Sequence, residues 1–596
     1  MSKPSASTKH RSEIHAIRPA LGADVVVQSL VNHGVDLIFS YPGGSVIPLH
    51  QALTRFHNQI RVVLPRHEQG GGFAAQGYAR STGKVGVCTA TSGPGAANLL
   101  TPVADAKLDS VPMVIITGQV GTKMIGTDAF QELPATEVFR SVTKHHTLIT
   151  DPNDISRVMK EAFYIANTGR KGPVLVDIPK DILTATITPD YDAEICLPGF
   201  IHPVPKPSKK DIYALLEAIR GAKRPVICAG GGVAAADAAA ELRSFVKKTG
   251  IPVAMTLPAL GVFPYEDPLS LNLLGMHGSV YANHAVHECD LLISLGCRFV
   301  DRITGNVQKF APHAQLAHVD IDLSEINKVC TASISILGDI KEVLTEINRK
   351  VLPPETSLEP WIQSIREWRK TDPLAYESMG EDIAPQHAIS MLDNLTREYD
   401  PIIATGVGQH QMWTAQFFKF SSPRRWLSSC GMGTMGFGLP AGMGAKLANP
   451  DKMVIVVDGD GSSLMNIQEM ATCFCEKIPV KVMLLNNQHL GMVVQWEDRF
   501  FSSNRGHTYL GPIDNPEATG KGTGIGPEIR YPDFVQIAKG FGWQGRSIRY
   551  QNELESGLKE MIDADGPYIL DVAVPYQEHV MPMIPAGGSF NDIIRK

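Results

Sequence analysis

The sequence predicts an α/β fold of three doubly wound domains, each built around a parallel sheet. Two observations support this fold class. Continuous Val- and Ile-rich runs alternate with helix-length segments along the chain, as they do where parallel strands are buried on both faces. With 596 residues the chain is also too long for one hydrophobic core, and Pro-rich stretches at 198–208 and 351–360 have the composition of linkers.

These linkers divide the chain into three blocks, which we expect to be domains at residues 18–190, 207–350 and 386–575, followed by a tail at 576–596. Each block contains short apolar runs bounded by turn residues, which is the pattern of strands. The predicted strands lie within residues 35–40, 61–64, 84–90, 112–117 and 173–178 in the first block, 224–232, 252–257, 290–296 and 316–322 in the second, and 401–410, 452–462, 479–487 and 567–575 in the third.

Composition and charge narrow the function. A formal net charge of −6 and the lack of a long Lys/Arg run argue against binding to nucleic acid. No stretch of about 18 consecutive apolar residues occurs, so we expect no membrane span. The nine cysteines are odd in number and scattered, which gives no disulfide framework and favours a reducing compartment.

The first fifteen residues are polar and basic and have no apolar core, which excludes a secretory signal. Their Ser, Lys and Arg content is shared with organelle transit peptides, but the stretch is short and contains Glu13. We therefore interpret it as the N-terminus of a bacterial protein and expect a cytoplasmic location, with organelle targeting as the alternative.

The segment from Gly459 to Asn487 carries the strongest chemical pattern. The apolar run 454–457 leads into an Asp-Gly-Asp-Gly turn, and the next predicted strand ends at Asn486 and Asn487. Because ligands bind at the carboxyl ends of neighbouring parallel strands, Asp460 and Asn487 can converge on one ligand. Their hard oxygens suit Mg²⁺, and the glycines let a diphosphate approach the backbone.

Two other interpretations of this segment compete with a metal and diphosphate site. The Gly-Asp-Gly turn could be a simple tight connection. The stretch also has acidic and polar residues at EF-hand offsets, namely Asp458, Asp460, Ser462 and Glu469. An EF-hand requires Gly where this chain has Ser463 and a helix where it has a strand, and the Asn pair on the next strand favours the diphosphate site.

Three further loops at strand ends are candidate sites. Glu68 opens a helix beside three consecutive glycines at 70–72, each of which costs a helix about 1 kcal/mol and therefore suggests that backbone or ligand packs closely there. The loop 91–95 is rich in glycine, precedes Asn98 and suits the polar edge of a ligand. Residues 408–411 include His410, for which a structural role is the more common one.

Together these motifs resemble the thiamine diphosphate enzymes, whose signature is a GDG triplet followed at this distance by an NN pair. Further segments resemble the acetohydroxyacid synthase (acetolactate synthase) family, in family order and over nearly the whole chain from about residue 20. They are YPGG (41–44), RHEQG (66–70), TSGPG (91–95), GTDAFQE (126–132), GPVLVDIPKD (172–181), DRITG (301–305), GFGLPA (436–441), NNQHLGMVVQWEDRF (486–500) and EHVMPMIPAGG (578–588).

The resemblance implies that the three blocks bind, in order, the pyrimidine of thiamine diphosphate, FAD, and the diphosphate with Mg²⁺, and that the tail closes over the active site. The middle block lacks a G-x-G-x-x-G fingerprint, so FAD rests on the resemblance alone. The implied Mg²⁺ ligands are Asp460, Asn487 and the main-chain oxygen of His489. The implied cofactor-binding residues are Gly44, Ser92, Asn98, Gln119, Arg170, Gly231, Gly232, Met276, His277, Asp320, Asp339, Val407, Gly408, Gln409, His410, Gly433, Met435, Gly461, Ser462, Met492 and Val493.

The implied activity is decarboxylation of pyruvate on thiamine diphosphate and condensation of the enamine with a second pyruvate or with 2-oxobutyrate, which begins valine, leucine and isoleucine biosynthesis. The implied catalytic residues are Glu68, Gln131, Lys180, Arg302, Met435 and Trp496. Glu68 would bond the aminopyrimidine ring and Met435 would bend the coenzyme. Arg302 would bind the carboxylate of the second substrate, and Trp496 would form a wall that favours the ethyl group of 2-oxobutyrate.

In this family the equivalents of Glu68 and Asp460 come from different chains, so the resemblance implies a homodimer or homotetramer. No regulatory domain is evident, and feedback control would need a separate small subunit. The alternatives are a pyruvate oxidase, a glyoxylate carboligase or an inactive scaffold. The QWEDRF and PMIPAGG segments disfavour the first, the presence of Glu68 disfavours the second, and intact Glu68, Asp460 and Asn487 disfavour the third.

Overall fold

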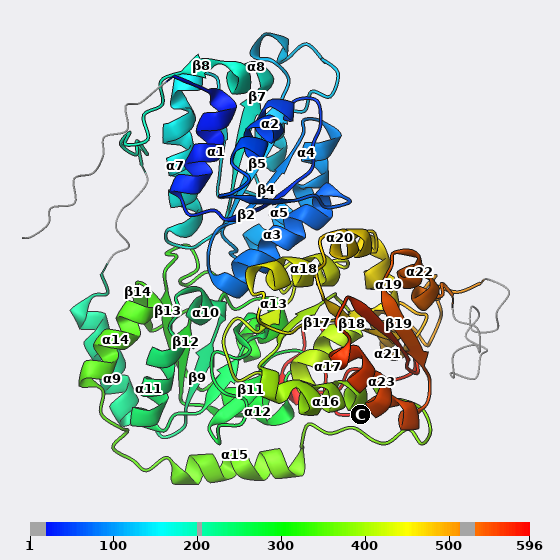
Figure 1. Cartoon of the computed structure of the whole chain (residues 1–596). Helices are drawn as coiled ribbons and strands as arrows, with labels where there is room; N and C mark the ends of the chain where they lie inside the picture. Colours follow the sequence, from blue (N-terminus) through cyan, green and yellow to red (C-terminus); the bar gives the residue numbers. More distant parts are fainter. Residues whose placement is uncertain (1–18, 200–205, 513–530) are drawn as a thin grey trace, which may run out of the picture.

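The computed structural model describes residues 19–199, 206–512 and 531–596. These residues form three six-stranded sheets in which all strands are parallel, so the predicted fold class is confirmed. In Figure 1 the N-terminal block (blue to cyan) lies above the middle block (green) and the C-terminal block (yellow to red). The N-terminal segment interpreted as bacterial, and residues 200–205 of the first predicted linker, lie outside the described residues.

The strands of the three sheets follow one another along the chain without exchange between blocks. The first sheet contains β2 (Leu37–Ser40), β3 (Arg61–Val63), β4 (Gly86–Ala90), β5 (Met113–Gln119), β6 (His145–Leu148) and β7 (Pro173–Pro179). The second contains β9 (Pro225–Ala229), β10 (Val253–Met255), β11 (Ser270–Leu273), β12 (Leu291–Leu295), β13 (Gln315–Asp320) and β14 (Ile334–Leu337). The third contains β15 (Ile402–Thr405), β16 (Trp426–Leu427), β17 (Val454–Gly459), β18 (Lys481–Asn486), β19 (Gln544–Ile548) and β20 (Tyr568–Ala573).

The sheets are wound in two different ways. The first has the order β3-β2-β4-β5-β7-β6 and the third has β16-β15-β17-β18-β20-β19, which is the same topology when strands are counted from the start of each sheet. The middle sheet has the order β11-β10-β9-β12-β13-β14. Counted in the same way, this is the 3-2-1-4-5-6 order of sheets that bind dinucleotides.

The strands that the sequence prediction missed are β6, β11, β14, β16 and β19, and each of them lies at the edge of its sheet. Central strands are buried on both faces and therefore read as continuous apolar runs. Edge strands need not be buried on both faces. The sequence of β6 is HHTL and that of β19 is QGRSI, and both strands are only partly buried. Two short strands, β1 (Ala20–Leu21) and β8 (Thr186–Ile187), form a separate antiparallel pair.

Helices cover both faces of each sheet. The longer helices of the first block are α1 (Gly22–Asn32), α2 (Ile47–Arg55), α3 (Glu68–Thr82), α5 (Leu100–Leu108) and α7 (Ile155–Asn167). Those of the second are α9 (Lys209–Gly221), α11 (Ala239–Thr249), α12 (Val280–Glu288) and α14 (Ile340–Lys350), and those of the third include α16 (Pro385–Thr396), α17 (Gln409–Phe417), α18 (Gly438–Ala448), α21 (Gly491–Phe500), α22 (Phe534–Gly540) and α23 (Gln551–Asp563). None of the helices within the described ranges is long and apolar enough to cross a membrane.

The connection between the second and third blocks contains a helix that was not predicted. After an irregular stretch, α15 (Glu359–Thr371) runs along the base of the molecule in Figure 1. It docks through Trp361, whose ring nitrogen donates to the carbonyl of Pro225 at 3.2 Å, and this tryptophan stacks edge-on against Trp368. The aromatic residues therefore anchor the linker to the middle sheet instead of leaving it extended.

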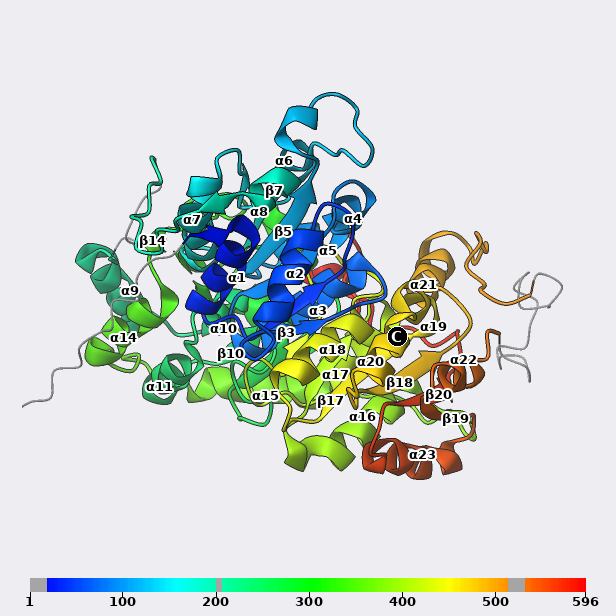
Figure 2. The same ribbon diagram turned by 45° about the horizontal axis from the view of Figure 1, so that its top comes forward.

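Helices α3 and α18 join the first block to the third, and they lie side by side in Figure 2. Their axes come close because small residues face each other: a Cβ atom on Gly77 would lie 2.0 Å from the carbonyl oxygen of Ala441, and one on Gly444 would lie 1.9 Å from that of Ala74. At the edge of the contact the rings of Phe73 and Phe437 meet at 5.4 Å. Backbone therefore packs directly on backbone at this interface.

We predict that Gly77→Ala destabilises the folded chain by at least about 1–3 kcal/mol, because the new methyl group forces the two helices apart. Denaturant unfolding at equal protein concentration measures this change. Gly221→Ala is the matched control, because a Cβ atom at the end of α9 meets nothing within 4 Å. Equal unfolding midpoints for the two variants would contradict the close contact.

Candidate functional site

The third sheet reverses its winding between β15 and β17, which are neighbours, and ligands bind at such reversals in open α/β sheets. Gly408, Gln409 and His410 follow β15, while Asp460 follows β17 as the first residue of the short helix α19 (Asp460–Ser463). Asn487 follows β18 directly. All of these residues line one cavity of about 110 Å³, called here the smaller cavity.

Polar atoms in the smaller cavity are buried without a protein partner. Asp460 Oδ1 accepts a hydrogen bond from the Gly461 N–H at 2.9 Å, but Asp460 Oδ2 and Gln409 Oε1 have no hydrogen-bond partner among the described residues. Burial raises the pKa of Asp460 to about 7, although the N–H groups of Gly461 and Gln488 counteract the shift. Buried oxygens without partners are costly, so the arrangement fits a bound cation.

The EF-hand interpretation of this segment does not fit the structure. The strand β17, not a helix, precedes Asp460. Glu469, which an EF-hand would turn onto the metal, instead binds the backbone of Arg66 and His67 in the first block. Among the described residues, no group of three or more His, Cys, Asp or Glu could hold a metal, so a cation here would also need amide, main-chain or ligand oxygens.

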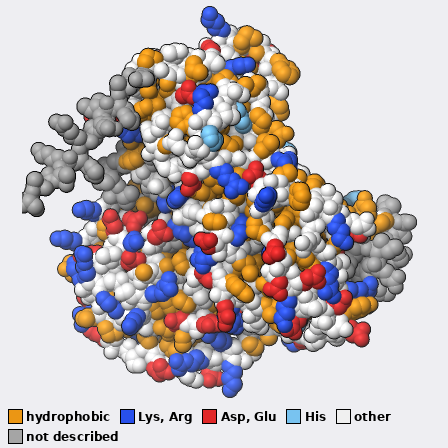
Figure 3. Space-filling model, viewed as in Figure 1, with side chains coloured by type: hydrophobic (Ala, Val, Ile, Leu, Met, Phe, Trp, Pro, Cys, Tyr) orange, Lys and Arg blue, Asp and Glu red, His pale blue; other side chains and the backbone are white. Residues whose placement is uncertain are grey.

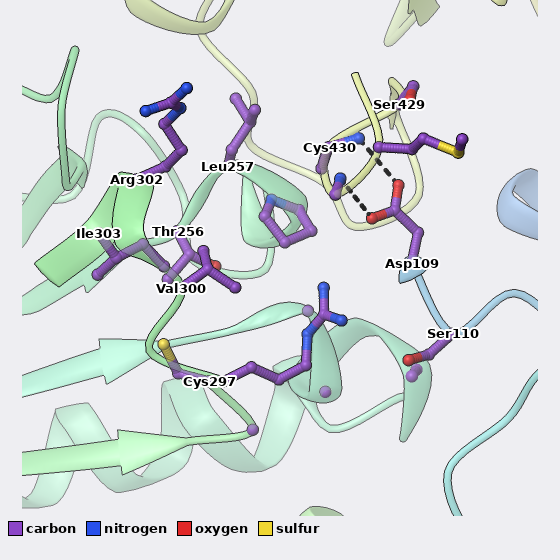
Figure 4. Close-up of a pocket in the computed structure, with 18 of the residues that line it drawn as sticks. Asp109, Ser110, Thr256, Leu257, Cys297, Val300, Arg302, Ile303, Ser429 and Cys430 are labelled. Carbon is purple, nitrogen blue, oxygen red and sulfur yellow. Dashed lines mark hydrogen bonds between the residues drawn. The ribbon is translucent and has the colours of Figure 1, made fainter. Parts of the chain in front are cut away.

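A larger cavity of about 570 Å³ lies where the three blocks meet, and Figure 4 shows part of its lining. It opens at the carboxyl ends of β9 and β12, where the middle sheet reverses its winding. His277 is buried in its wall with Nδ1 unpartnered among the described residues, and burial lowers the pKa of this histidine to about 4. The predicted residues that line the larger cavity are Arg170, Gly231, Gly232, Met276, His277, Arg302, Asp320, Asp339, Val407, Gly408, Gly433, Met492 and Trp496.

The predicted residues that line the smaller cavity are Val407, Gly408, Gln409, His410, Met435, Asp460, Gly461, Ser462, Asn487, His489, Met492 and Val493. Val407, Gly408 and Met492 therefore line both cavities, which adjoin. Every residue that the resemblance implied in the second and third blocks borders one cavity or the other. The His489 side chain bonds back to the carbonyl of Asn487 through Nδ1 at 2.8 Å, which fixes the turn after β18.

Apart from Arg170, which lines the larger cavity, the predicted residues of the first block form a separate group and line neither cavity. Asn98 donates to Glu68 Oε2 at 2.9 Å, and the Ser92 N–H donates to Ser45 Oγ at 3.0 Å. Gln119 is already bound, since it donates to Asp177 at 3.0 Å and to the carbonyl of Leu133. The other members of this group are Gly44, Gln131 and Lys180, of which Gly44 and Lys180 are exposed. Within one chain, Glu68 and Asp460 therefore line no common cavity.

A network of buried charges holds the loop that leads to Met435. Asp109 accepts from the N–H groups of Cys430 at 2.9 Å and Gly431 at 2.8 Å, as the dashed lines in Figure 4 mark. Asp105 accepts from the hydroxyl groups of Ser429 and Thr434. Arg80 forms an ion pair with each carboxylate, at 3.1 Å from Asp105 and 2.9 Å from Asp109.

Sequence reasoning missed the role of these carboxylates. Asp105 and Asp109 lie at successive turns of one helix end, and nothing in their spacing points to a loop more than three hundred residues away. Glu469 did appear in the sequence analysis, but only as part of the EF-hand-like pattern. The glycines at 70–72 were the one available signal, since they indicated that something packs against the first turn of α3.

Comparisons with known proteins agree with the geometry. The thiamine pyrophosphate enzyme family matches in three parts: the N-terminal TPP binding domain over residues 21–138, the central domain over 212–347, and the C-terminal TPP binding domain over 406–572. Acetolactate synthase 1, chloroplastic, of Oryza sativa subsp. japonica is 52% identical over 97% of this chain and 88% of its own length. The Zea mays protein of the same name is 53% identical over 97% and 89%, and the Arabidopsis thaliana acetolactate synthase, chloroplastic, is 50% identical over 99% and 87%.

These relatives correct one expectation. The bacterial cytoplasmic location inferred from the first fifteen residues is wrong, because the similar proteins are named as chloroplastic plant enzymes, which points to an organelle. These matches extend over 97–99% of the chain. By its sequence likeness over almost its whole length, the chain belongs to the acetolactate synthase family of thiamine diphosphate enzymes.

Proposed function

We propose that this chain catalyses the acetolactate synthase reaction, in which pyruvate loses carbon dioxide and its two-carbon remainder joins a second pyruvate or 2-oxobutyrate. The products are 2-acetolactate and 2-aceto-2-hydroxybutyrate, the first intermediates of branched-chain amino acid synthesis. The observation that carries the proposal is the convergence of Gln409, Asp460 and Asn487 at one sheet reversal, in a chain about half identical to acetolactate synthases. Thiamine diphosphate, when bound, supplies the electron sink that decarboxylation of a 2-oxoacid requires.

The smaller cavity is the proposed diphosphate and Mg²⁺ site. Asp460 Oδ2, the Asn487 side-chain oxygen and the main-chain oxygen of His489 would supply hard oxygens to Mg²⁺. The unpartnered Oδ2 of Asp460 supports this assignment, because a cation removes the cost of burying it. Gln409 and His410, at the amino end of α17, would contact the diphosphate.

The larger cavity is the proposed FAD site. Its position at the reversal of a 3-2-1-4-5-6 sheet is the position of a dinucleotide in that topology. Gly231 and Gly232 follow β9, and a Cβ atom on Gly232 would lie 2.8 Å from the Cα atom of Gly296, so the two loops at the reversal touch each other. His277, unpartnered at Nδ1, provides a buried polar group for the cofactor.

Residues of the chain would also select and hold the substrates. Arg302 lines the larger cavity with an exposed guanidinium group, which suits a carboxylate. Trp496 borders the same cavity from α21, where it would form the wall that favours an ethyl group over a methyl group. Glu68, whose carboxylate accepts a hydrogen bond from Asn98, would share a proton with a ring nitrogen of the coenzyme. Gln131 and Lys180 would be further active-site residues that the first block supplies.

A homodimer is the proposed active unit, because Glu68 and Asp460 line no common cavity within one chain. A second copy would bring its Glu68 half-site to the Asp460 half-site of the first. Exposed apolar side chains support such a contact, and Figure 3 shows several on the upper block. Exposed apolar side chains of the chain include Met124 and Phe130 in the first block and Met465, Phe474 and Phe501 in the third, and Phe130 is 88% exposed. A homotetramer and a separate regulatory subunit stay predictions from the resemblance.

The domain limits stay proposals as well: pyrimidine binding at 18–190, FAD binding at 207–350, diphosphate binding at 386–575 and a closing tail at 576–596. Contacts of the tail support its role. Gln409 donates to the carbonyl of Glu578 at 2.9 Å, and the Asn306 N–H donates to that of Gly588 at 2.7 Å. The tail therefore connects the loop after β15 with the segment that follows Arg302.

The first test is the product. Purified protein given pyruvate, thiamine diphosphate, Mg²⁺ and FAD should form acetolactate without stoichiometric consumption of oxygen. Glu68→Gln should lower kcat by at least about a hundredfold, as expected when a positioned proton-transfer group is lost. Acetolactate can be quantified after acid conversion to acetoin.

Glu137→Gln is the matched control, because it changes an exposed glutamate on a helix of the same block and should leave kcat within about twofold. Acetyl phosphate and peroxide as products would show a pyruvate oxidase instead. A near wild-type rate in Glu68→Gln would show that this glutamate does not hold the proton.

The second test concerns the dimer. Glu68→Gln and Asp460→Asn should each inactivate the protein, but a refolded equimolar mixture should recover about a quarter of wild-type activity. Random pairing makes half of the dimers mixed, and each mixed dimer has one site with both residues intact. If mass spectrometry shows that heterodimers form but activity is not recovered, the proposal of a site shared between chains is contradicted.

A further inference from the structure

The carboxylate of Glu469 lies beneath the first turn of α3, although it belongs to the third block. It starts helix α20 (Glu469–Cys475) and is completely buried. Its Oε1 accepts from the N–H groups of Arg66 at 3.0 Å and His67 at 3.1 Å, and its Oε2 accepts from the Thr472 hydroxyl at 2.7 Å. A side chain of the block that holds Asp460 therefore binds the two residues that precede Glu68.

The glycines at the start of α3 are explained by this contact and by two others. A Cβ atom on Gly70 would lie 2.4 Å from Glu469 Oε1, so a larger residue would displace the carboxylate. A Cβ atom on Gly71 would lie 2.9 Å from the ring of Pro65, and one on Gly72 would lie 2.5 Å from that of Pro102. Each of the three glycines therefore lies against a different close neighbour, which leaves no room for a side chain at that position.

We propose that Glu469 is a positioning residue for Glu68, which it holds in place through the N–H groups of Arg66 and His67. The proposal rests on the proposed function, in which Glu68 binds the coenzyme ring. Glu469 fixes the backbone just before Glu68, while Asn98 fixes its side chain at 2.9 Å. Glu68 is thus held at two points: Glu469 fixes the backbone before it, and Asn98 fixes its side chain.

Capping of α3 is a less complete explanation of the same contact. The cap is already supplied by His67, whose Nδ1 accepts from the Gln69 N–H at 3.1 Å. The N–H groups that Glu469 binds belong to residues outside the helix. Desolvation raises the pKa of Glu469 to about 7 even though Thr472, Arg66 and His67 donate to it, so its burial is costly. Because burial of Glu469 costs free energy without improving the cap of α3, we infer that this carboxylate has another role.

The first measurement uses the cofactor-free protein. Hydrogen–deuterium exchange of the peptide that covers residues 64–70 should accelerate at least about tenfold in Glu469→Gln. The Arg66 N–H donates to both carboxylate oxygens, at 3.0 and 3.2 Å, so the amide N–H would face it, and the remaining bonds would lose the negative charge that strengthens them. Glu553→Gln is the matched control, since Glu553 accepts from the N–H groups of Arg549 and Tyr550 before α23 in the same way, at 3.0 Å each. The control should leave exchange at 64–70 unchanged.

The second measurement uses the loaded enzyme. Glu469→Gln should lower kcat for acetolactate formation at least about tenfold with little change in the KM for pyruvate, whereas Glu553→Gln should change neither. In the Glu68→Gln background the same substitution should have almost no further effect on kcat, because two residues that act through one group are not additive. An equal fold-loss in both backgrounds would overturn the proposal, as would unchanged exchange at 64–70.

Failure of this proposal is distinguishable from failure of the proposed function. A wild-type protein that forms no acetolactate would contradict the function, while the exchange result in the cofactor-free protein would still report whether Glu469 holds residues 66 and 67. If Glu469→Gln does not fold, Thr472→Val removes only the hydroxyl bond to Oε2. It should accelerate exchange at 64–70 by a smaller factor, and no acceleration would overturn the proposal.

Discussion

The direct backbone contact between α3 and α18 fixes the geometry on which the functional loops depend. Glu68 begins α3, and Met435 lies shortly before α18. Because Gly77 and Gly444 leave no side chain between the helices, the two axes cannot shift without a clash of backbone atoms. Packed interfaces of this kind move between discrete arrangements rather than deform continuously. This packing therefore places the loops at the two helix starts relative to each other.

Carboxylates reinforce this contact in both directions. Glu469 reaches from the third block to the amino end of α3, and Asp105 and Asp109 reach from the first block to the loop before Met435. Burial and the neighbouring Asp109 carboxylate raise the pKa of Asp105, although Arg80 pairs with it. A buried ion pair is weak evidence for stability, but removal of one partner is costly. Such a network is suited to specifying one position of a loop.

The sequence predicted the central strands and the loops at their carboxyl ends well, and the edge strands poorly. Runs such as 454–457 are apolar because helices cover both faces, so composition alone reveals them. The pairing of Asp460 with Asn487 was also predictable, since both follow neighbouring strands and strand ends share an edge. The separation of Glu68 from Asp460 followed only from the resemblance, because no local pattern encodes which loops of different blocks line the same cavity.

The roles of Glu469, Asp105 and Asp109 were not predictable for a different reason. Each binds main-chain or hydroxyl groups of a segment that is hundreds of residues away, and such partners leave no pattern of residue types. Only the geometric demand they impose is visible, as at Gly70, where the side chain must be absent. A glycine that destabilises a helix thus indicates that another group packs closely there, but it does not show which residue that group belongs to.

The two sheet topologies correspond to two different kinds of predicted site within the chain. The first and third sheets have identical winding, and each has predicted site residues at its strand ends, whereas the larger cavity opens at the strand ends of the differently wound middle sheet. Val407, Gly408 and Met492 belong to the third block but line both cavities. Ligands in the two cavities would therefore contact the same loop after β15 and the same turn of α21. Any shift of that loop would change both sites together, and the tail that binds Gln409 lies where it would restrain such a shift.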